Sequence, residues 1–237
     1  MDKKTGIIIG VLVASFVALI GVSVYQSGRS TIDYDQYDLG TVLEASEESG
    51  EIGELIMGDP DAPVKVFEYG DYQCTACAPT NPYIKQIVEE YNGKVAVVFR
   101  TYILSYHNNG TAAASAALAA AQQGYWSEYK DLLFTNQNDW YYSDAAKRQE
   151  QFEQYFEQVT KGKGDLEKFR EDMNSEAVKK KIEFDRGVYE KVTAADGEDD
   201  QWTPMFYVDG ELIDQRELST DDFLSLLRNK IDKALKK

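Results

Sequence analysis

The chain has 237 residues, of which 43% are hydrophobic and 28% are charged, and its net charge is -16 at pH 7. This length suits one domain with an insertion, and the apolar fraction is sufficient to bury a core. The strong negative charge argues against binding to nucleic acid and against docking on anionic lipid, because both need clustered lysine and arginine side chains.

The first element predicted along the chain is an uncharged apolar stretch at residues 6–25. Its length matches the roughly 20 residues that cross a bilayer as a helix. Lys3 and Lys4 precede it, so the positive-inside rule predicts a cytoplasmic N-terminus and an extracytoplasmic remainder. We predict a transmembrane signal-anchor within residues 1–27. A cleaved signal peptide, with a poor small-residue cleavage site at residues 21–23, is the alternative, and both export the folded part.

Residues 28–51 are rich in aspartate and glutamate and contain few large aliphatic side chains. Such a segment buries too little apolar surface to offset the entropy that it loses on ordering. We therefore predict a flexible acidic linker here, followed by an edge strand near residues 52–57. The folded domain is predicted to occupy residues 52–237.

Hydrophobic periodicity predicts that this domain begins with a βαβ unit, made of a strand at 64–69, a helix at 81–91 and a buried strand at 94–101. Helical patterns follow at residues 111–123, 126–135, 145–159, 166–173 and 177–192. A hairpin of strands at 205–208 and 211–213 and a closing amphipathic helix at 221–235 complete the domain. We interpret the helical block as an insertion of about residues 108–195 within one α/β domain.

Cys74 and Cys77 are the only cysteines, and they lie between the first predicted strand and helix. A Cys-x-x-Cys pair at such a junction indicates a redox dithiol, with two inert buried cysteines as the alternative. A structural zinc site needs four ligands, whereas the chain offers this pair and one histidine, His107. A disulfide that closes so short a ring contributes little stability. The helix N-terminus favours the thiolate of Cys74, which predicts Cys74 as the nucleophile and Cys77 as the resolving thiol.

Three motifs resemble the DsbA-like branch of the thioredoxin superfamily: GDPDAPVKVFEYGDYQCTAC at 58–77, YILSYHNNGTAAASAALAA at 102–120 and TPMFYVDG at 203–210. The resemblance runs from about residue 52 to the C-terminus. It implies an α/β thioredoxin fold with an inserted helical domain, preceded in this chain by one transmembrane helix. It also implies disulfide exchange with exported unfolded or reduced proteins and reoxidation by a membrane redox partner. We predict no cofactor and no metal.

The resemblance also implies roles for residues outside the dithiol. Glu68 shares a strand face with Val64 and Val66, and an acid at this position in the family exchanges protons with the buried cysteine. A solvated glutamate is the alternative. The resemblance further implies that Thr203-Pro204 carries a cis proline facing the dithiol, next to backbone that pairs with the substrate. An ordinary trans proline at the start of a strand is the alternative.

Thr75 and Ala76, between the cysteines, are predicted to tune the redox potential. They supply neither the proline nor the histidine that the strongest oxidants of the family carry there, so we predict a moderate oxidant. A disulfide isomerase or reductase, and a non-catalytic membrane-tethered binding module, are the alternatives. Isomerases of the superfamily usually carry a dimerisation domain ahead of the catalytic one, whereas this chain has the acidic segment, which favours a monomer. The role of His107 stays open.

Overall fold

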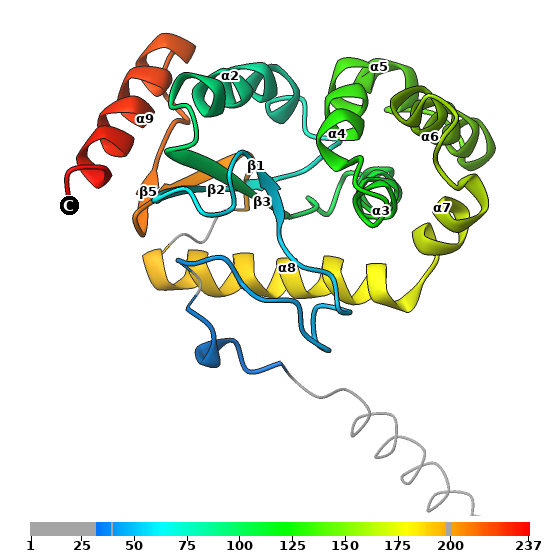
Figure 1. The fold of residues 1–237 in the computed structure, drawn as a ribbon, viewed down its shortest axis with the longest axis horizontal. Helices are drawn as coiled ribbons and strands as arrows, with labels where there is room; N and C mark the ends of the chain where they lie inside the picture. The colour runs from blue at the N-terminus through cyan, green and yellow to red at the C-terminus, as the bar shows by residue number, and fades with distance from the viewer. Residues whose placement is uncertain (1–31, 39, 198–200) are drawn as a thin grey trace, which may run out of the picture. The chain divides into compact units, whose positions relative to one another are not determined.

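A mixed β-sheet with the strand order β1-β3-β2-β4-β5 lies at the centre of the computed structural model (Figure 1). The structure describes residues 32–38, 40–197 and 201–237, and residues 34–237 form one unit. The strands are β1 (Leu55–Met57), β2 (Val64–Gly70), β3 (Val95–Thr101), β4 (Met205–Val208) and β5 (Glu211–Ile213). β2 and β3 are parallel, and the remaining pairs are antiparallel.

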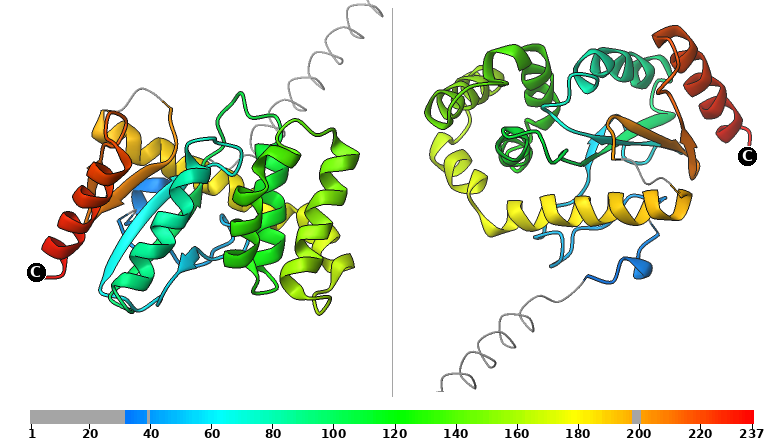
Figure 2. Two further views of the ribbon diagram at one scale, coloured as in Figure 1. Left: turned by 90° about the horizontal axis from the view of Figure 1, so that it is seen from above. Right: turned by 180° about the vertical axis from the view of Figure 1, so that it is seen from behind.

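Both faces of the sheet are covered, which explains the apolar run at residues 95–99 of β3 and the burial of the whole strand. Helices α2 (Cys77–Glu90) and α9 (Thr220–Ala234) lie on one face, and α8 (Glu176–Asp196) lies on the other (Figures 1 and 2). Side chains alternate between the faces along each strand. Glu68 pairs with Phe99 of β3 and Phe206 of β4, so these three residues share one face.

The helical insertion lies between β3 and β4 in the chain and beside the sheet in space (Figure 1). Its first helix, α3, is rich in alanine, and these small buried side chains allow α4, α7 and α8 to pack closely against it. The insertion comprises α8 together with α3 (Gly110–Ala121), α4 (Trp126–Thr135), α5 (Gln137–Trp140), α6 (Ala145–Thr160) and α7 (Leu166–Met173).

The strands and longer helices agree with the periodicity of the sequence, and the main differences are at boundaries. Helix α2 begins at Cys77 rather than at residue 81, because its first residues carry no apolar repeat. Pro79 lies in the first turn, where proline is tolerated, and Pro82 lies inside the helix. The short elements α5 and η1 (Tyr34–Gln36) were not predicted. Asp209 and Gly210 both have positive φ angles, 53° and 75°, as the predicted tight hairpin turn requires.

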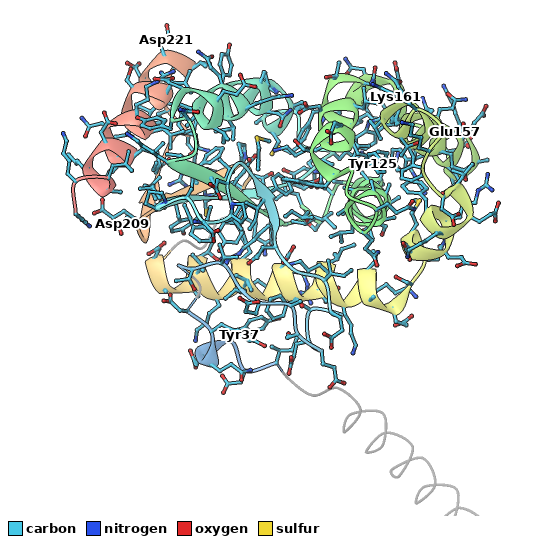
Figure 3. All side chains as sticks on the ribbon, in the orientation of Figure 1. Tyr37, Tyr125, Glu157, Lys161, Asp209 and Asp221 are labelled. Atoms are coloured by element: carbon cyan, nitrogen blue, oxygen red, sulfur yellow. The ribbon has the colours of Figure 1, made fainter. Side chains whose placement is uncertain are left out.

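The structure differs from the expectation of a flexible linker at residues 28–51 in the part that it describes. Leu43 and Ser49 are buried, and the rings of Tyr34 and Tyr37 contact Phe184 of α8 at centroid distances of 5.7 and 5.3 Å. Tyr37 lies on the side of α8 that faces away from the sheet (Figure 3). The two tyrosines provide apolar contact with α8. This contact was not predicted from the sequence because the composition of the segment is dominated by acidic residues.

A buried ionic network joins this segment to the sheet and α8. Arg100 of β3 forms an ion pair with Glu54 at 2.8 Å and donates hydrogen bonds to the Tyr69 hydroxyl at 2.9 Å and the Thr41 carbonyl at 2.7 Å. Glu54 also lies 3.6 Å from Lys181 of α8. Because buried charges need partners, this network holds the chain ahead of β1 against the sheet.

No helix within the described residues is long and apolar enough to span a bilayer. The predicted transmembrane segment at residues 6–25 lies outside the described residues and stays a prediction.

Candidate active site

Cys74 and Cys77 lie where the chain passes from β2 to α2, as the sequence predicted. Both are free thiols. The carbonyl of Cys74 accepts hydrogen bonds from the N–H groups of Cys77 at 3.1 Å and Ala78 at 3.3 Å, so Cys77 opens the helix and Cys74 precedes it. The flanking Thr75 and Ala76 are exposed. Cys74 is 6% exposed and Cys77 is fully buried, so the dithiol lies next to these exposed residues, with its backbone set by the start of α2.

The two thiols differ strongly in acidity. A hydrogen bond from the Cys77 thiol, with further hydrogen bonds from Thr203 and from backbone N–H groups, lowers the pKa of Cys74 to about 6 against the opposing effect of burial. Complete burial raises the pKa of Cys77 well above its usual range. Cys74 is consequently the thiolate near neutral pH, and Cys77 keeps its proton.

The loop that leads into β4 faces the dithiol from the opposite side. Cys74 Sγ lies 3.3 Å from the carbonyl oxygen of Thr203, to which the thiol donates. The Thr203–Pro204 peptide bond is cis, as the resemblance implied. The Thr203 hydroxyl is buried and has no other hydrogen-bond partner within the described residues, so it is available to donate to the Cys74 thiolate.

The helical insertion holds the dithiol loop through Gln137 of α5. Its side-chain amide donates to the carbonyl of Tyr72 at 2.8 Å and to the carbonyl of Cys74 at 3.0 Å. Trp126 of α4 donates to the Tyr72 hydroxyl at 3.0 Å. The sequence did not single out Gln137, because the element that carries it is too short to show periodicity.

A second set of hydrogen bonds connects the loop to the chain around α3 and α5. The side chain of Gln73 accepts from the N–H of Asn109 at 2.7 Å and donates to the carbonyl of Tyr141 at 3.0 Å. The side-chain amide of Asn109 donates to the carbonyls of Trp140 and Tyr141, each at 3.0 Å. The geometry of the dithiol loop is thus fixed by residues of the insertion as well as by the sheet.

His107 lies beside the same loop, paired with Asp71. Its Nδ1 is 2.6 Å from the Asp71 carboxylate, which also accepts from the N–H groups of Gln73 at 2.8 Å and Leu104 at 2.9 Å. Burial opposes protonation of His107, but the hydrogen bond and charge of Asp71 outweigh it and raise the pKa of His107. Asp71 was not predicted, and it connects the dithiol loop to the loop that follows β3.

Glu68 is fully buried on the face of β2 that α2 covers, as its strand position predicted. Burial raises the pKa of its carboxyl, opposed by the charge of Lys130. Lys130 Nζ, from α4, lies 3.9 Å from the Glu68 carboxylate. Lys130 was also missed in the sequence, although it shares the buried helix face of Trp126, Tyr129 and Leu133 and is the only charged residue there.

The described residues contain no group of three or more His, Cys, Asp or Glu side chains that could hold a metal ion. The site offers the chemistry of a dithiol, with one acidic and one buried thiol near a buried carboxyl group.

Comparisons with known proteins agree with this geometry. A family model described as "Thioredoxin" matches residues 51–229. "Probable disulfide bond formation protein D" from Bacillus anthracis is 31% identical over 191 residues, which cover 76% of this chain and 78% of that protein. "Na(+)/H(+) antiporter NhaA 3" from Salinispora tropica is 30% identical over 155 residues, which cover 65% of this chain but 21% of that protein.

The fold is also found in a solved structure. Oxidised BdbD from Bacillus subtilis superimposes with a TM-score of 0.59 at 22% sequence identity, over 84% of this chain and 99% of that chain. The family match includes the dithiol loop, the sheet and the helical insertion. The chain belongs to the DsbA-like branch of the thioredoxin superfamily and is a protein-disulfide oxidoreductase.

Proposed function

We propose that this protein introduces disulfides into exported unfolded or reduced proteins by exchange through Cys74 and Cys77. The observation that carries the proposal is the unequal acidity of the two thiols, since the pKa of Cys74 is lowered to about 6 and the pKa of Cys77 is raised. An acidic thiol and a fully buried, less acidic thiol beside it are the two groups that exchange through a mixed disulfide needs.

The reaction begins from the oxidised dithiol. A substrate thiolate attacks Cys74 Sγ, the bond between Cys74 and Cys77 breaks, and Cys77 leaves as a thiolate that takes up a proton. A second substrate thiolate then attacks the substrate sulfur of the mixed disulfide. Cys74 leaves as a thiolate, so the substrate gains one disulfide while the enzyme gains two electrons and becomes the reduced dithiol.

The direction of electron flow follows from the stability of that reduced form. A lowered pKa of Cys74 stabilises the thiolate, which makes the oxidised enzyme a stronger oxidant. The corresponding cysteine has a pKa of about 7 in the reductant thioredoxin and about 3.5 in the strong oxidant DsbA. A pKa of about 6 for Cys74 therefore supports a moderate oxidant, in keeping with Thr75 and Ala76 between the cysteines.

The remaining site residues take supporting roles in this proposal. The backbone at Thr203 and Pro204 pairs with an extended segment of the substrate beside its cysteine, as an added strand. Glu68 exchanges protons with Cys77 during the two steps. The closeness of Cys74 to Thr203 and the burial of Glu68 support these roles.

We place the catalytic domain outside the cytoplasm, held to the membrane by the apolar segment at residues 6–25. That location supplies exported substrates and an environment in which disulfides persist. A membrane redox partner reoxidises the dithiol after each cycle, and the domain acts as a monomer.

A redox titration of the full chain against glutathione tests the direction of transfer. We expect a potential between that of thioredoxin, about -270 mV, and that of DsbA, about -120 mV. A potential near or below about -270 mV would contradict the oxidase. Efficient rearrangement of scrambled disulfides, without net oxidation of reduced substrates, would instead favour an isomerase.

A non-catalytic binding module is a second candidate, favoured by Tyr106 and Tyr142, whose side chains are 69% and 91% exposed. Such rings suit contact with unfolded chains. Binding of unfolded protein by the full chain without any disulfide exchange would favour this candidate over the oxidase.

A further inference from the structure

The carboxyl group of Glu68 lies under the end of β2 that leads to the dithiol. Gly70 follows it on the same strand face, and a Cβ placed on Gly70 would lie 3.5 Å from Glu68 Oε1 and only 2.5 Å from the Phe99 ring. The missing side chain at Gly70 therefore leaves the carboxyl group room to extend along the strand toward the dithiol loop.

Lys130, from α4 of the helical insertion, is a second buried charged residue next to Glu68. Its side chain and that of Glu68 are fully buried, and Nζ lies 5.0 Å from the Phe99 ring and 5.2 Å from the Trp126 ring. At 3.9 Å the ion pair is too long for a hydrogen bond. Neither oxygen of Glu68 nor Nζ of Lys130 has a hydrogen-bond partner within the described residues.

A buried ion pair at this distance and without hydrogen bonds is expected to contribute little to the stability of the fold. A buried ion pair recovers its desolvation cost only when good geometry and further hydrogen bonds satisfy both groups, and apolar residues of similar volume are often as stabilising. Buried groups of this kind, with perturbed acidity and close to reactive thiols, are more typical of functional sites. The chemistry of the dithiol therefore accounts for this pair better than stability does.

Other charged and titratable groups that interact with Glu68 and Lys130 lie on α2, on α4 and in the dithiol loop. Cys77, which opens α2, is coupled to both members, since the charge of Glu68 contributes to raising its pKa and its own charge favours protonated Lys130. Burial lowers the pKa of Lys130, whereas Glu68 opposes that change. Asp131 of α4 and Lys85 of α2 also interact electrostatically with Lys130, and Tyr72 of the dithiol loop interacts with Glu68.

We propose that Lys130 is a positioning residue for proton transfer, whose ammonium group keeps Glu68 ionised in the reduced enzyme so that Glu68 can take the proton of Cys77. This inference rests on the proposed disulfide exchange and extends it to the inserted helices. The step belongs to reoxidation, when Cys77 must attack the mixed disulfide between Cys74 and the oxidising partner.

The Cys77 thiol gives its proton to the Glu68 carboxylate, directly or through one water. The resulting Cys77 thiolate attacks Cys74 Sγ, a bond forms between the two cysteines, and the partner's sulfur leaves as a thiolate that carries away the electron pair. Without the nearby ammonium group, burial alone would keep Glu68 protonated and unable to accept this proton.

The experiment follows the mixed disulfide that the reduced full-length protein forms with oxidised glutathione, and measures the rate at which Cys77 resolves it as a function of pH. In K130M the midpoint of this profile is expected to move upward by about one pH unit, with an approximately tenfold slower rate below the midpoint. K130R keeps the charge and should retain the wild-type midpoint. K85M removes a lysine that is 47% exposed and should match wild type.

Two comparisons separate this role from a structural one. Unfolding in urea measures how far K130M destabilises the fold, since the variant leaves the Glu68 carboxyl group buried without its partner, and the rate profile is measured where K130M stays folded. If K130M does not fold, K130Q removes the same charge and is measured in its place. In the E68Q background, K130M should change the profile no further, because the effect passes through Glu68.

The outcomes also distinguish this inference from the proposed function. A wild-type profile in K130M, or an equally large effect of K130M in the E68Q background, would overturn the role of Lys130 while leaving disulfide exchange intact. A wild-type protein that neither forms nor resolves the mixed disulfide would overturn the proposed function, and this inference with it.

Discussion

The Cys74 sulfur lies 3.3 Å from the carbonyl oxygen of Thr203, although 129 positions separate the two residues in the chain. This contact places the acidic thiol against the loop that carries the cis proline and leads into β4. It leaves Cys77 behind Cys74, fully buried at the start of α2. The two thiols thus differ in acidity and in burial, since Cys74 is 6% exposed and Cys77 is fully buried.

Replacing Cys77 by Ala should trap mixed disulfides. Cys74 can still react with a disulfide or an oxidised substrate in this variant, but no internal thiol remains to resolve the product. We expect covalent complexes that disappear on reduction, detected by non-reducing electrophoresis and mass spectrometry of material purified from the exported fraction. The matched variant C74A should trap far fewer complexes, because the remaining thiol of Cys77 is buried and has a raised pKa. Equal trapping by the two variants would contradict the assignment of Cys74 as the nucleophile.

The reactivity of Cys74 should depend on pH with a midpoint of about 6. Only the thiolate is alkylated at an appreciable rate, so the rate with iodoacetamide should rise through that midpoint and then level off. T203V removes a hydroxyl that is available to the sulfur and should move the midpoint upward. T220V alters an exposed threonine of α9 and serves as the control. A wild-type midpoint near 9 would contradict the activated thiol.

The same shift predicts how the stability of the reduced protein depends on pH. The pKa of Cys74 is lower in the folded state, so the thiolate stabilises the fold fully above the unfolded pKa of about 8.5. This contribution is lost as the pH falls through about 6. The difference in unfolding free energy between the reduced wild type and C74S should therefore grow as the pH rises between these values. A difference that does not change with pH would contradict the shift.

Gln137→Leu should destabilise the protein and loosen the dithiol loop. The substitution removes both hydrogen bonds from the Gln137 amide and leaves the buried carbonyls of Tyr72 and Cys74 without these donors. Each unsatisfied buried group costs about 1–3 kcal/mol, so we expect a loss of at least about 1 kcal/mol in urea unfolding. Q158L, at an exposed position of α6, should have little effect. Wild-type stability in Q137L would show that the loop does not depend on the insertion.

Glu54→Gln should weaken the attachment of the segment ahead of β1. It removes a charge paired with Arg100 at 2.8 Å and near Lys181 at 3.6 Å, both buried. Breaking a buried ion pair by removing one partner costs about 3–5 kcal/mol, which urea unfolding would detect. Limited proteolysis should then cut within residues 40–51 faster than in wild type. E51Q, at an exposed glutamate nearby, is the matched control, and equal behaviour of the two variants would contradict this attachment.

The sequence by itself determined the elements that depend on local physics. The alternation and apolar content of residues 64–69 and 94–101 predicted buried parallel strands, and helical periodicity placed α4 and α7 at their observed boundaries. The spacing of Cys74 and Cys77 at a strand-to-helix junction indicated a redox dithiol, because that chemistry is carried by neighbouring residues. The cis proline came from resemblance, since X–Pro geometry cannot be derived from composition.

Only the tertiary structure decided which distant residues surround the dithiol. Lys130, Gln137 and Asp71 were not predicted, because their significance lies in contacts with Glu68, with the loop carbonyls and with His107 that no local pattern encodes. The acidic segment ahead of β1 was expected to be solvated, since composition records its charge but not the partners that Arg100 and Phe184 provide. Local periodicity reports which face of an element is buried, whereas the partner of a buried charge is chosen by the packing of the whole chain.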